Sequence, residues 1–326
     1  MADYGSIVAD KAISQIEKKV HRIYVQAARE LTEKLGTFLK KHEARDKQKR
    51  ELVEKGLMTE QEYKDWLKGQ VFMEKQWRDK VDQATRIMND ANAEAMKVIE
   101  GKKLEVFAEN YNFAAYELED EIGFDIGFNI YNSQSVARLI KDEPQILPKW
   151  KIDEKKDYLW NEKKVTRSIT QGIIQGESVD DIAKRLIKDL CSQNERKMRT
   201  LTRTAVTGAQ NAGRMEQMHD AVDSGIKMKK KWLATLDDRT RDTHRDLDGQ
   251  VQEVDDPFES DLGDIMFPGD PSAEPGNVFN CRCTMIYVYE GIDYHSVRRS
   301  GDGDLVENMT YREWEAWKEG KGNGKR

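Results

Sequence analysis

Hydrophobic residues in the first 143 positions recur at steps of three and four, which is the period of one face of an α-helix. One series consists of Ile13, Ile16, Val20, Ile23, Ala27, Leu31, Leu35 and Leu39. A second series runs from Trp66 through Met73, Trp77, Val81 and Ala95 to Ile99. The sequence has no proline before Pro144, so the strongest helix breaker is missing from this region. The pattern predicts long amphipathic helices.

The segment between the two series, residues 40–55, is almost wholly charged or polar and is typical of a solvated helix face or a linker. Thr59 and Glu62 have the spacing of a capping box, which predicts the start of the second helix.

Residues 149–224 are again free of proline and have a helical period. Ser178 has the position of a helix start, and Ile182, Leu186, Ile187 and Leu190 would form the inner face of that short helix. Ser192 and Glu195 predict a second capping box and a further helix. Gly225 is a typical helix end.

After Gly225 the period changes from helical to alternating. Residues 232–236 and 284–289 are expected to be strands, and Asp238 is expected to cap a short helix that ends at Gly249. Four prolines make residues 255–277 a long irregular loop, and a last helix is expected from Thr310. The predicted fold is mostly α, with long amphipathic helices followed by a small α+β C-terminal module that contains short strands and an acidic loop.

These changes in pattern predict three regions. Residues 1–147 would form an elongated helical region, 148–226 a second helical part, and 227–326 a small α+β core with a C-terminal helix.

Composition excludes several classes of protein. The 326 residues include 54 Lys and Arg against 60 Asp and Glu, a net charge of −6, and 35% are charged. No apolar run approaches the ~18 residues of a membrane-spanning helix, so no membrane association is expected. Three cysteines make a disulfide framework implausible, and the first residues lack the features of a signal peptide.

Charge also bears on nucleic acid. Residues 232–270 contain twelve acidic residues against three arginines, a balance of −9. The basic run of Lys227, Lys229, Lys230 and Lys231 just before them could contact DNA phosphates, although a solvated strand edge is the commoner use of such lysines. We expect at most weak, salt-sensitive contact with double-stranded DNA.

One cluster could carry chemistry. In an extended chain Cys281 and Cys283 point to the same side, and with His244 they supply three ligands that suit tetrahedral zinc. Asp237, Asp238 or water could be the fourth ligand. The alternative is that both cysteines are reduced and structural and that His244 only hydrogen-bonds a loop.

A structural role without metal is available to the residues around this cluster. Trp232 would pack in the core against the strand that carries Met285 and Tyr287, and Asp238 would satisfy amides of the short helix. Arg239 or Arg241 could form a bidentate pair with a carboxylate of the acidic loop.

The alternative class is an enzyme. His244 with Asp246 and Asp248, beside the cysteine pair, could form a metal-dependent hydrolase or nuclease site. The sequence has no HExxH, no Gly-x-Ser-x-Gly and no phosphate-binding loop, which disfavours catalysis.

Residues 160–283 resemble the phage head-morphogenesis, or minor capsid, family of the phage Mu F and SPP1 minor head protein type. The first block is Gly172–Ser178, and the second runs from Arg203-Thr204-Ala205 to Asn211-Ala212-Gly213-Arg214. The most specific block comprises Trp232, Asp237, Asp238, Arg239, Thr240, His244, Gly249, Asn280, Cys281, Arg282 and Cys283. Where many relatives have cysteines, this chain has Arg241 and His244, and Val278 replaces a histidine. Arginine cannot bind a metal.

The resemblance implies a non-enzymatic minor capsid protein, present in the virion near the portal and in the host cytoplasm during assembly. It implies the portal protein and capsid or scaffold proteins as partners, and a role in head assembly and in DNA ejection. Similar domains occur fused to toxins, but residues 291–326 are too short for one. The amphipathic helices of residues 1–147 are expected to dock onto the portal or the inner shell. The resemblance, more than strand topology, also implies that His244 lies near the cysteine pair.

Overall fold

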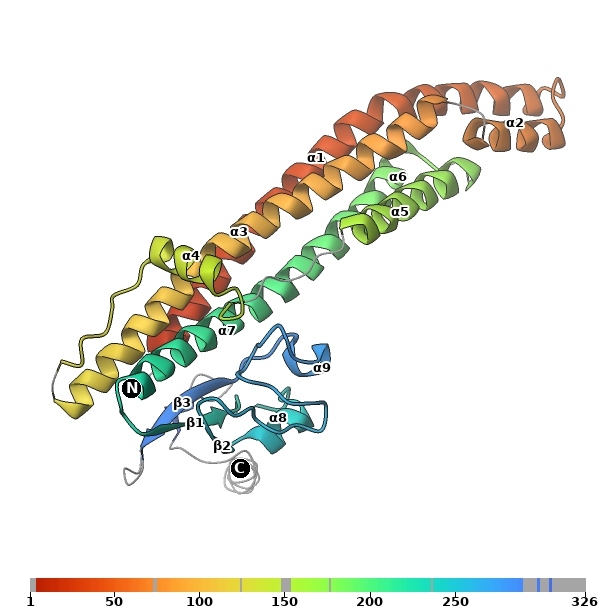
Figure 1. Ribbon diagram of the computed structural model, residues 1–326. Helices are drawn as coiled ribbons and strands as arrows, with labels where there is room; N and C mark the ends of the chain where they lie inside the picture. The colour runs from red at the N-terminus through yellow and green to blue at the C-terminus, as the bar shows by residue number, and fades with distance from the viewer. Residues whose placement is uncertain are drawn as a thin grey trace, which may run out of the picture. The chain divides into compact units, whose positions relative to one another are not determined.

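Figure 1 shows the computed structural model, in which long helices precede a small sheet. The structure describes residues 4–72, 75–123, 125–147, 154–175, 177–235, 237–289, 298–299 and 305–306. The predicted helix from Thr310, Leu236 and the side chains of Met73 and Trp77 lie outside the described residues. The expected fold class, mostly α with a small α+β part, is confirmed.

The bounds of the helices and strands are as follows. The helices are α1 (Tyr4–Glu54), α2 (Glu60–Phe72), α3 (Lys75–Ile122), α4 (Ser133–Asp142), α5 (Glu154–Gln175), α6 (Val179–Leu186), the π-helix η1 (Ile187–Cys191), α7 (Ser192–Asp223), α8 (Asp242–Leu247) and α9 (Pro275–Val278). The strands are β1 (Met228–Leu233), β2 (Val251–Glu253), β3 (Thr284–Tyr289), β4 (Arg298–Arg299) and β5 (Leu305–Val306).

The chain divides into two compact units, each built from segments that are distant in sequence. Unit 1 comprises Met1–Glu17, Ile99–Trp150 and Thr200–Arg326, and unit 2 comprises Lys18–Val98 and Lys151–Arg199. Helices α1, α3 and α7 contribute residues to both units. The units therefore cut across the three consecutive regions predicted from the sequence.

Unit 2 is helical, and its core follows the predicted apolar stripe of α1. Val20, Ala27, Leu31, Leu35 and Leu39 are buried. Tyr24 takes the inward place that the sequence pattern gives to Ile23, which is half-buried. The tyrosine hydroxyl donates to the Asn92 side chain on α3, so a buried polar contact joins these two helices.

That contact begins a chain of buried asparagine side chains in unit 2. The Asn92 amide donates to Asn194 of α7 at 3.0 Å, and Asn194 donates to Asn161 of α5 at 3.1 Å. Asn161 then donates back to Asn89 of α3 at 2.8 Å. Because a shifted helix would leave these amides unpaired in the core, the network favours one alignment of the four helices.

Two of the helix starts predicted from side-chain capping, at Thr59 and Ser178, are confirmed. The Glu62 amide donates to the Thr59 hydroxyl at 3.2 Å, and the Thr59 amide donates to the Glu62 carboxylate at 2.7 Å. Ser178 caps α6 by accepting from the Asp181 amide at 3.2 Å.

The helix predicted after Ser192 is present as α7, but the capping box predicted at Ser192 is wrong. Ser192 has helical backbone angles, and α6, η1 and α7 follow one another without a break. The residues on either side of it, Cys191 and Asn194, are buried, and Asn194 donates to the Leu190 carbonyl at 2.9 Å. Tertiary packing therefore keeps the helix running through a sequence that resembles a cap.

Unit 1 contains a three-stranded sheet in the order β2-β1-β3, with both pairs antiparallel, and the two-stranded sheet of β4 and β5. The predicted strand at 232–236 was placed too late, because β1 spans Met228–Leu233. Its inward residues are Met228, Lys230 and Trp232, and Trp232 lies opposite Met285 of β3. Gly225, with φ of +90°, ends α7 as predicted and leads the chain into β1.

Candidate metal centre

The side chains of His244, Cys281 and Cys283 come together in unit 1, as the sequence predicted. His244 lies on α8, and the two cysteines lie in the extended segment just before β3. The Nδ1 atom of His244 is 3.3 Å from the Cys283 sulfur and 3.7 Å from the Cys281 sulfur. All three residues are buried, with 3%, 2% and 3% of their surfaces exposed for His244, Cys281 and Cys283.

The antiparallel register explains this proximity. Leu233, the last residue of β1, pairs with Thr284, the first residue of β3. The turn at Asp237 therefore leaves the sheet at the end where the cysteine segment enters it. The topology of the sheet therefore places His244 near the cysteines. From the sequence, this proximity was expected from the family resemblance more than from strand topology.

Burial and the neighbouring groups act differently on the two thiols. Burial alone would raise the pKa of the Cys283 thiol, but hydrogen bonding with Cys281 and His244 lowers it below its ordinary value. The hydrogen bond to Cys283, together with burial, raises the pKa of the Cys281 thiol. Cys283 is therefore the sulfur that loses its proton more readily.

Helix α7 holds the cysteine segment in place through side chains spaced three and four residues apart. Thr204 accepts from the Asn280 amide at 3.0 Å, and Thr207 donates to the Cys281 carbonyl at 3.0 Å. Asn211 donates to the Cys283 carbonyl at 3.3 Å and accepts from the Met285 amide at 3.1 Å. Arg214 continues the series by donating to the Met285 carbonyl at 3.0 Å.

Sequence reasoning missed the role of these four residues. The signal was present, because Thr204, Thr207, Asn211 and Arg214 recur at helical spacing and are buried among small residues of α7 such as Ala205. A buried polar stripe requires partners, and here the partners are the backbone groups of residues 280–285.

Asp237 is held by arginine. The guanidinium of Arg282 makes two hydrogen bonds to its carboxylate, one of them 2.8 Å long, and the Thr240 hydroxyl donates to it at 3.1 Å. Although burial would raise the pKa of the Asp237 carboxyl, the hydrogen bonds and charge of Arg282 lower it to about 2. Asp237 does not join the group formed by His244 and the cysteines.

Two details of the predicted turn are corrected. Asp237, not Asp238, accepts the Arg239 amide, at 3.1 Å, and Asp238 is exposed. Helix α8 starts after Arg241 and has no side-chain cap. Arg239 pairs with the Asp237 carboxylate through one contact of 3.3 Å, as a prediction for Arg239 or Arg241 allowed, but the bidentate arginine is Arg282. Its position between the two cysteines directs it to the opposite side of the extended chain. Arg241 instead donates to the Phe279 carbonyl.

The remaining motif residues have structural roles. Trp232 is fully buried, with its ring centroid 5.2 Å from that of Phe258 and 5.8 Å from that of His244. Gly249 has φ of +82° and donates its amide to the Trp232 carbonyl at 3.0 Å. Asn280 has φ of +56°, a left-handed conformation that asparagine tolerates better than most residues.

The basic run does not present a uniform surface. Lys230 is fully buried, donates to the Met266 carbonyl at 3.0 Å, and so lacks the exposed ammonium that a phosphate contact requires. Lys229 pairs with Glu253 of β2 at 2.7 Å. Lys227 is exposed and Lys231 is half-buried.

The geometry disfavours the hydrolase alternative. Asp246 is exposed, and Asp248 accepts the Ala234 amide at 2.8 Å, so this carboxylate serves the backbone. Among the described residues, the group around His244 contains no carboxylate. The near-complete burial of its three side chains also leaves little room for a substrate.

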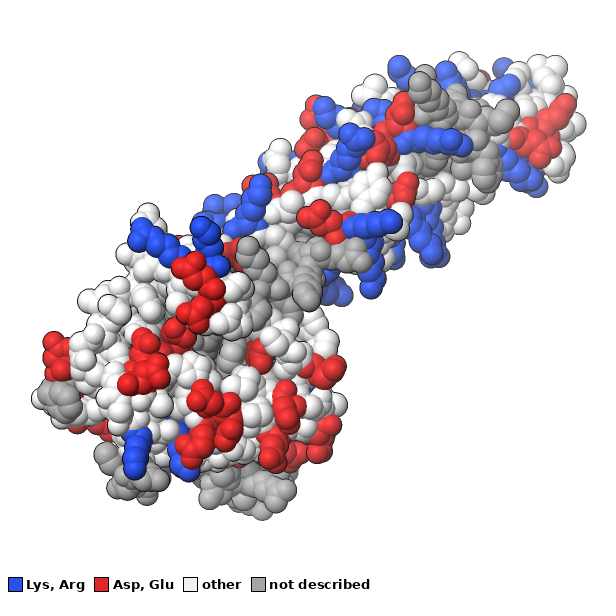
Figure 2. Space-filling model, viewed as in Figure 1, with Lys and Arg blue, Asp and Glu red and all other residues white. Residues whose placement is uncertain are grey.

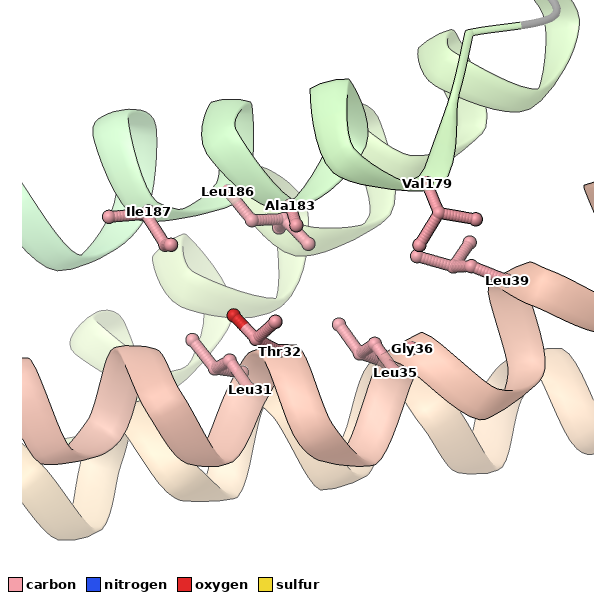
Figure 3. Close-up of a pocket in the computed structure, with 9 residues that line it drawn as sticks. All are labelled: Leu31, Thr32, Leu35, Gly36, Leu39, Val179, Ala183, Leu186 and Ile187. Atoms are coloured by element: carbon pink, nitrogen blue, oxygen red, sulfur yellow. The ribbon is translucent and has the colours of Figure 1, made fainter.

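Figure 3 shows a cavity in unit 2 between α1 and the α6–η1 segment. It is lined by Leu31, Thr32, Leu35, Gly36, Leu39, Val179, Ala183, Leu186 and Ile187. The single polar side chain, Thr32, already donates to the Ala28 carbonyl at 2.9 Å. A pocket without convergent polar groups is a packing gap and not a ligand site.

None of the described helices combines the length and the apolar character that crossing a membrane would require.

Comparison with known proteins gives consistent similarities. A family model described as phage Mu protein F like protein matches residues 163–286. The minor head protein GP7 of Bacillus phage SPP1 is 32% identical over 223 residues, which cover 65% of this chain and 69% of that protein. No solved structure matches.

Two further relatives are longer than the region they share with this chain. The NAD(+)–arginine ADP-ribosyltransferase EFV of Enterococcus faecalis is 28% identical over 242 residues, which cover 72% of this chain and 48% of that protein. The uncharacterized protein YqbB of Bacillus subtilis is 32% identical over 126 residues, covering 37% of this chain and 40% of that protein. The chain thus spans less than half of either relative.

Proposed function

The chain belongs to the phage Mu protein F-like family of phage head proteins, and from this premise we propose that it is a minor head protein that docks onto the portal or the inner shell of the procapsid and assists head assembly. The observation that carries the proposal is the 32% identity to GP7 over two thirds of that protein. In this proposal the protein is assembled in the host cytoplasm and lies inside the finished head.

The similarity to the transferase does not support assigning an enzymatic activity to this chain. About half of that protein lies outside the similarity. The similarity to a structural head protein supports a non-enzymatic role, and the burial of His244 and the cysteines agrees with it.

A surface for docking is available within the expected region, residues 1–147. The rings of Tyr4 on α1 and Phe113 on α3 have centroids 4.8 Å apart, and those of Phe113 and Tyr116 are 6.2 Å apart. Tyr4 is 45% exposed and Tyr116 is 62% exposed. Exposed aromatic clusters are enriched at protein interfaces, because a rigid ring buries much surface at a small entropic cost. We call these three residues the aromatic cluster.

Deleting residues 1–147 would be a poor test of this docking. The α3 backbone at Phe107 lies directly against Gly213 of α7, and Arg214 reaches Asn110. The deletion would therefore remove packing partners of α7 and destabilise unit 1 itself, so point variants test the docking more directly.

We predict that the double variant Tyr4→Ser, Tyr116→Ser enters procapsids at least about 10-fold less than the wild type, since losing two interface aromatics costs more than ~1.4 kcal/mol. The measurement is the amount of the protein in procapsids purified after co-expression with portal, scaffold and capsid proteins, with cross-linking to identify the contacted protein.

The matched control is Val251→Ser, Leu262→Ser, which removes two apolar side chains that are 42% and 44% exposed outside residues 1–147. This control should be incorporated normally. Equal incorporation of both double variants, with unchanged unfolding midpoints, would show that the aromatic cluster is not the docking surface.

A further inference from the structure

We propose that His244, Cys281 and Cys283 bind one zinc ion, which fastens helix α8 to the cysteine segment held by α7. The inference does not depend on the proposed function. Zinc lies about 2.0 Å from an imidazole nitrogen and about 2.3 Å from a thiolate, so tetrahedral geometry separates nitrogen and sulfur by about 3.5 Å. The observed separations of Nδ1 from the two sulfurs are 3.3 and 3.7 Å.

The histidine is oriented for this task by its other nitrogen. Nε2 lies 2.9 Å from the Asn277 carbonyl oxygen, which can only accept, so Nε2 carries the proton. The lone pair then lies on Nδ1, on the side of both sulfurs. Asn277 is itself fixed, since it is fully buried and donates to the Gly263 carbonyl at 3.1 Å. Such second partners are typical of metal-binding histidines.

The cysteines are positioned equally firmly. Thr207 and Asn211 hold the Cys281 and Cys283 carbonyls against α7. The Cys283 amide lies 3.4 Å from the Cys281 sulfur and donates to it, which fixes the position of that sulfur. Three donors from two distant segments therefore converge before any ion is added.

Charge is balanced by this donor set. Binding of Zn²⁺ releases one proton from each thiol to solvent, and the neutral imidazole binds through its lone pair. The complex of one dication with two thiolates has no net charge, so it can be buried at low cost. Among the described residues the group offers no fourth His, Cys, Asp or Glu ligand, so a water molecule completes the tetrahedron.

The chemistry of the donors selects the metal. Two sulfurs and one imidazole suit zinc and disfavour magnesium and calcium, which prefer oxygen ligands. The site lies beside a region with little regular secondary structure, where residues 254–274 contain no helix or strand apart from one isolated bridge, at Phe258 and Ile265. A metal that joins α8 to the α7-held segment stabilises this region directly.

The test uses the full chain purified without a polyhistidine tag under reducing conditions. Elemental analysis should find one zinc per chain in the wild type and in the control Cys191→Ser, which changes a buried cysteine of unit 2 that is not part of the group. Cys283→Ser and His244→Ala should each retain at least about 10-fold less zinc. Chelator should lower the unfolding midpoint of the wild type and of Cys191→Ser.

A cobalt titration keeps the proposal testable if a variant fails to fold. Cobalt(II) added to metal-free wild-type protein should give the absorption bands of tetrahedral thiolate coordination, which saturate at one ion per chain and are displaced by zinc. Wild-type protein with less than about a tenth of a zinc per chain and without these bands would overturn the proposal. So would equal zinc contents in the wild type and Cys283→Ser.

Discussion

At the scale of single residues, the inward orientation of Lys230 explains why the start of β1 was misplaced. Its ammonium donates to the Met266 carbonyl and lies 5.1 Å from the ring centroid of Phe258. Burial lowers the pKa of Lys230 to about 8. Lysine rarely occupies an inward position, so the run of lysines concealed the alternation of Met228, Lys230 and Trp232.

The residues of the metal centre were predictable to different degrees. The pairing of Cys281 with Cys283 follows from alternation in an extended chain, and it holds here although hydrogen-bonded strand begins only at Thr284. The bidentate partner of Asp237 was not predictable, because the nearby Arg239 also pairs with it and only the fold brings the distant Arg282 to its carboxylate. The hydrogen-bond partners of the polar α7 side chains were not predictable, because the sequence does not show which backbone groups lie opposite them.

His219 of α7 provides a prediction about pH. Its Nε2 atom is 3.2 Å from the Asp255 carboxylate, and its Nδ1 atom is 3.9 Å from that of Glu216. The interaction with Glu216 and the charge of Asp255 raise the pKa of His219, against the effects of burial and of Lys230. A raised folded-state pKa stabilises the protein below the unfolded value of about 6.5, and this contribution is lost as the pH rises through the folded pKa.

We therefore expect His219→Gln to reduce the free energy of unfolding more at about pH 5.5 than at about pH 8.5. Urea unfolding of the wild type and the variant at both pH values measures the difference. An equal loss at the two pH values would contradict the assigned ion pairs.

At the scale of elements, α7 depends on glycines that permit close approach of backbone. A Cβ atom at Gly213 would lie 2.4 Å from the Phe107 carbonyl oxygen of α3, and one at Gly208 would lie 2.6 Å from the Gly269 carbonyl oxygen. Small residues such as Ala205, Ala209 and Ala212 are visible in this part of the sequence, but the sequence does not show that the neighbours of the glycines are backbone atoms.

Gly213→Ala is predicted to reduce the free energy of unfolding by about 1–3 kcal/mol, since the backbone of α3 or α7 must move to admit the methyl group. The control is Gly101→Ala on α3, where a Cβ would meet nothing within 4 Å and alanine should stabilise the helix by about 0.5–1 kcal/mol. Denaturant unfolding distinguishes the two. A neutral Gly213→Ala would show that α3 does not constrain α7 there.

Most helices were predictable because their apolar periods are long and regular, as in α1, where the charged stretch after Leu39 proved to be a solvated continuation of the same helix. Its Asp46 accepts from Tyr63 of α2. The joins between helices were less predictable. Cap signatures are local, whereas the continuity of α6, η1 and α7 is determined by residues buried on both sides of Ser192.

At the scale of the whole molecule, the small net charge conceals two opposite charges. Unit 2 contains 31 Lys and Arg against 23 Asp and Glu, a net charge of +8, whereas unit 1 contains 23 against 37, a net charge of −14. Figure 2 shows basic side chains gathered over the helices of unit 2 and acidic side chains gathered over unit 1. Any attraction to nucleic acid should therefore arise in unit 2 and not at Lys227 and the lysines of β1.

We predict weak binding to a random DNA duplex, falling about 10-fold or more between about 50 and 200 mM salt. Lys163→Glu with Arg167→Glu, on the exposed surface of α5, should weaken it further. The control, Lys227→Glu with Lys231→Glu, should have a smaller effect. Fluorescence anisotropy measures all three proteins. Tight binding at physiological salt, or a larger effect of the control, would contradict this assignment.

The interleaving of the two units along the chain has a consequence for synthesis. Unit 2 is complete once Arg199 has left the ribosome, but the α3 residues Phe107 and Tyr111 must wait for their α7 partners Gly213 and Asp220, and the sheet must wait for Tyr289. At about 5–20 residues per second, translating the remaining 90 or so residues takes roughly 5–20 s. During that interval the nascent protein displays a finished helical unit and an unfinished one, so a chaperone or an assembly partner can bind it before β3 is made.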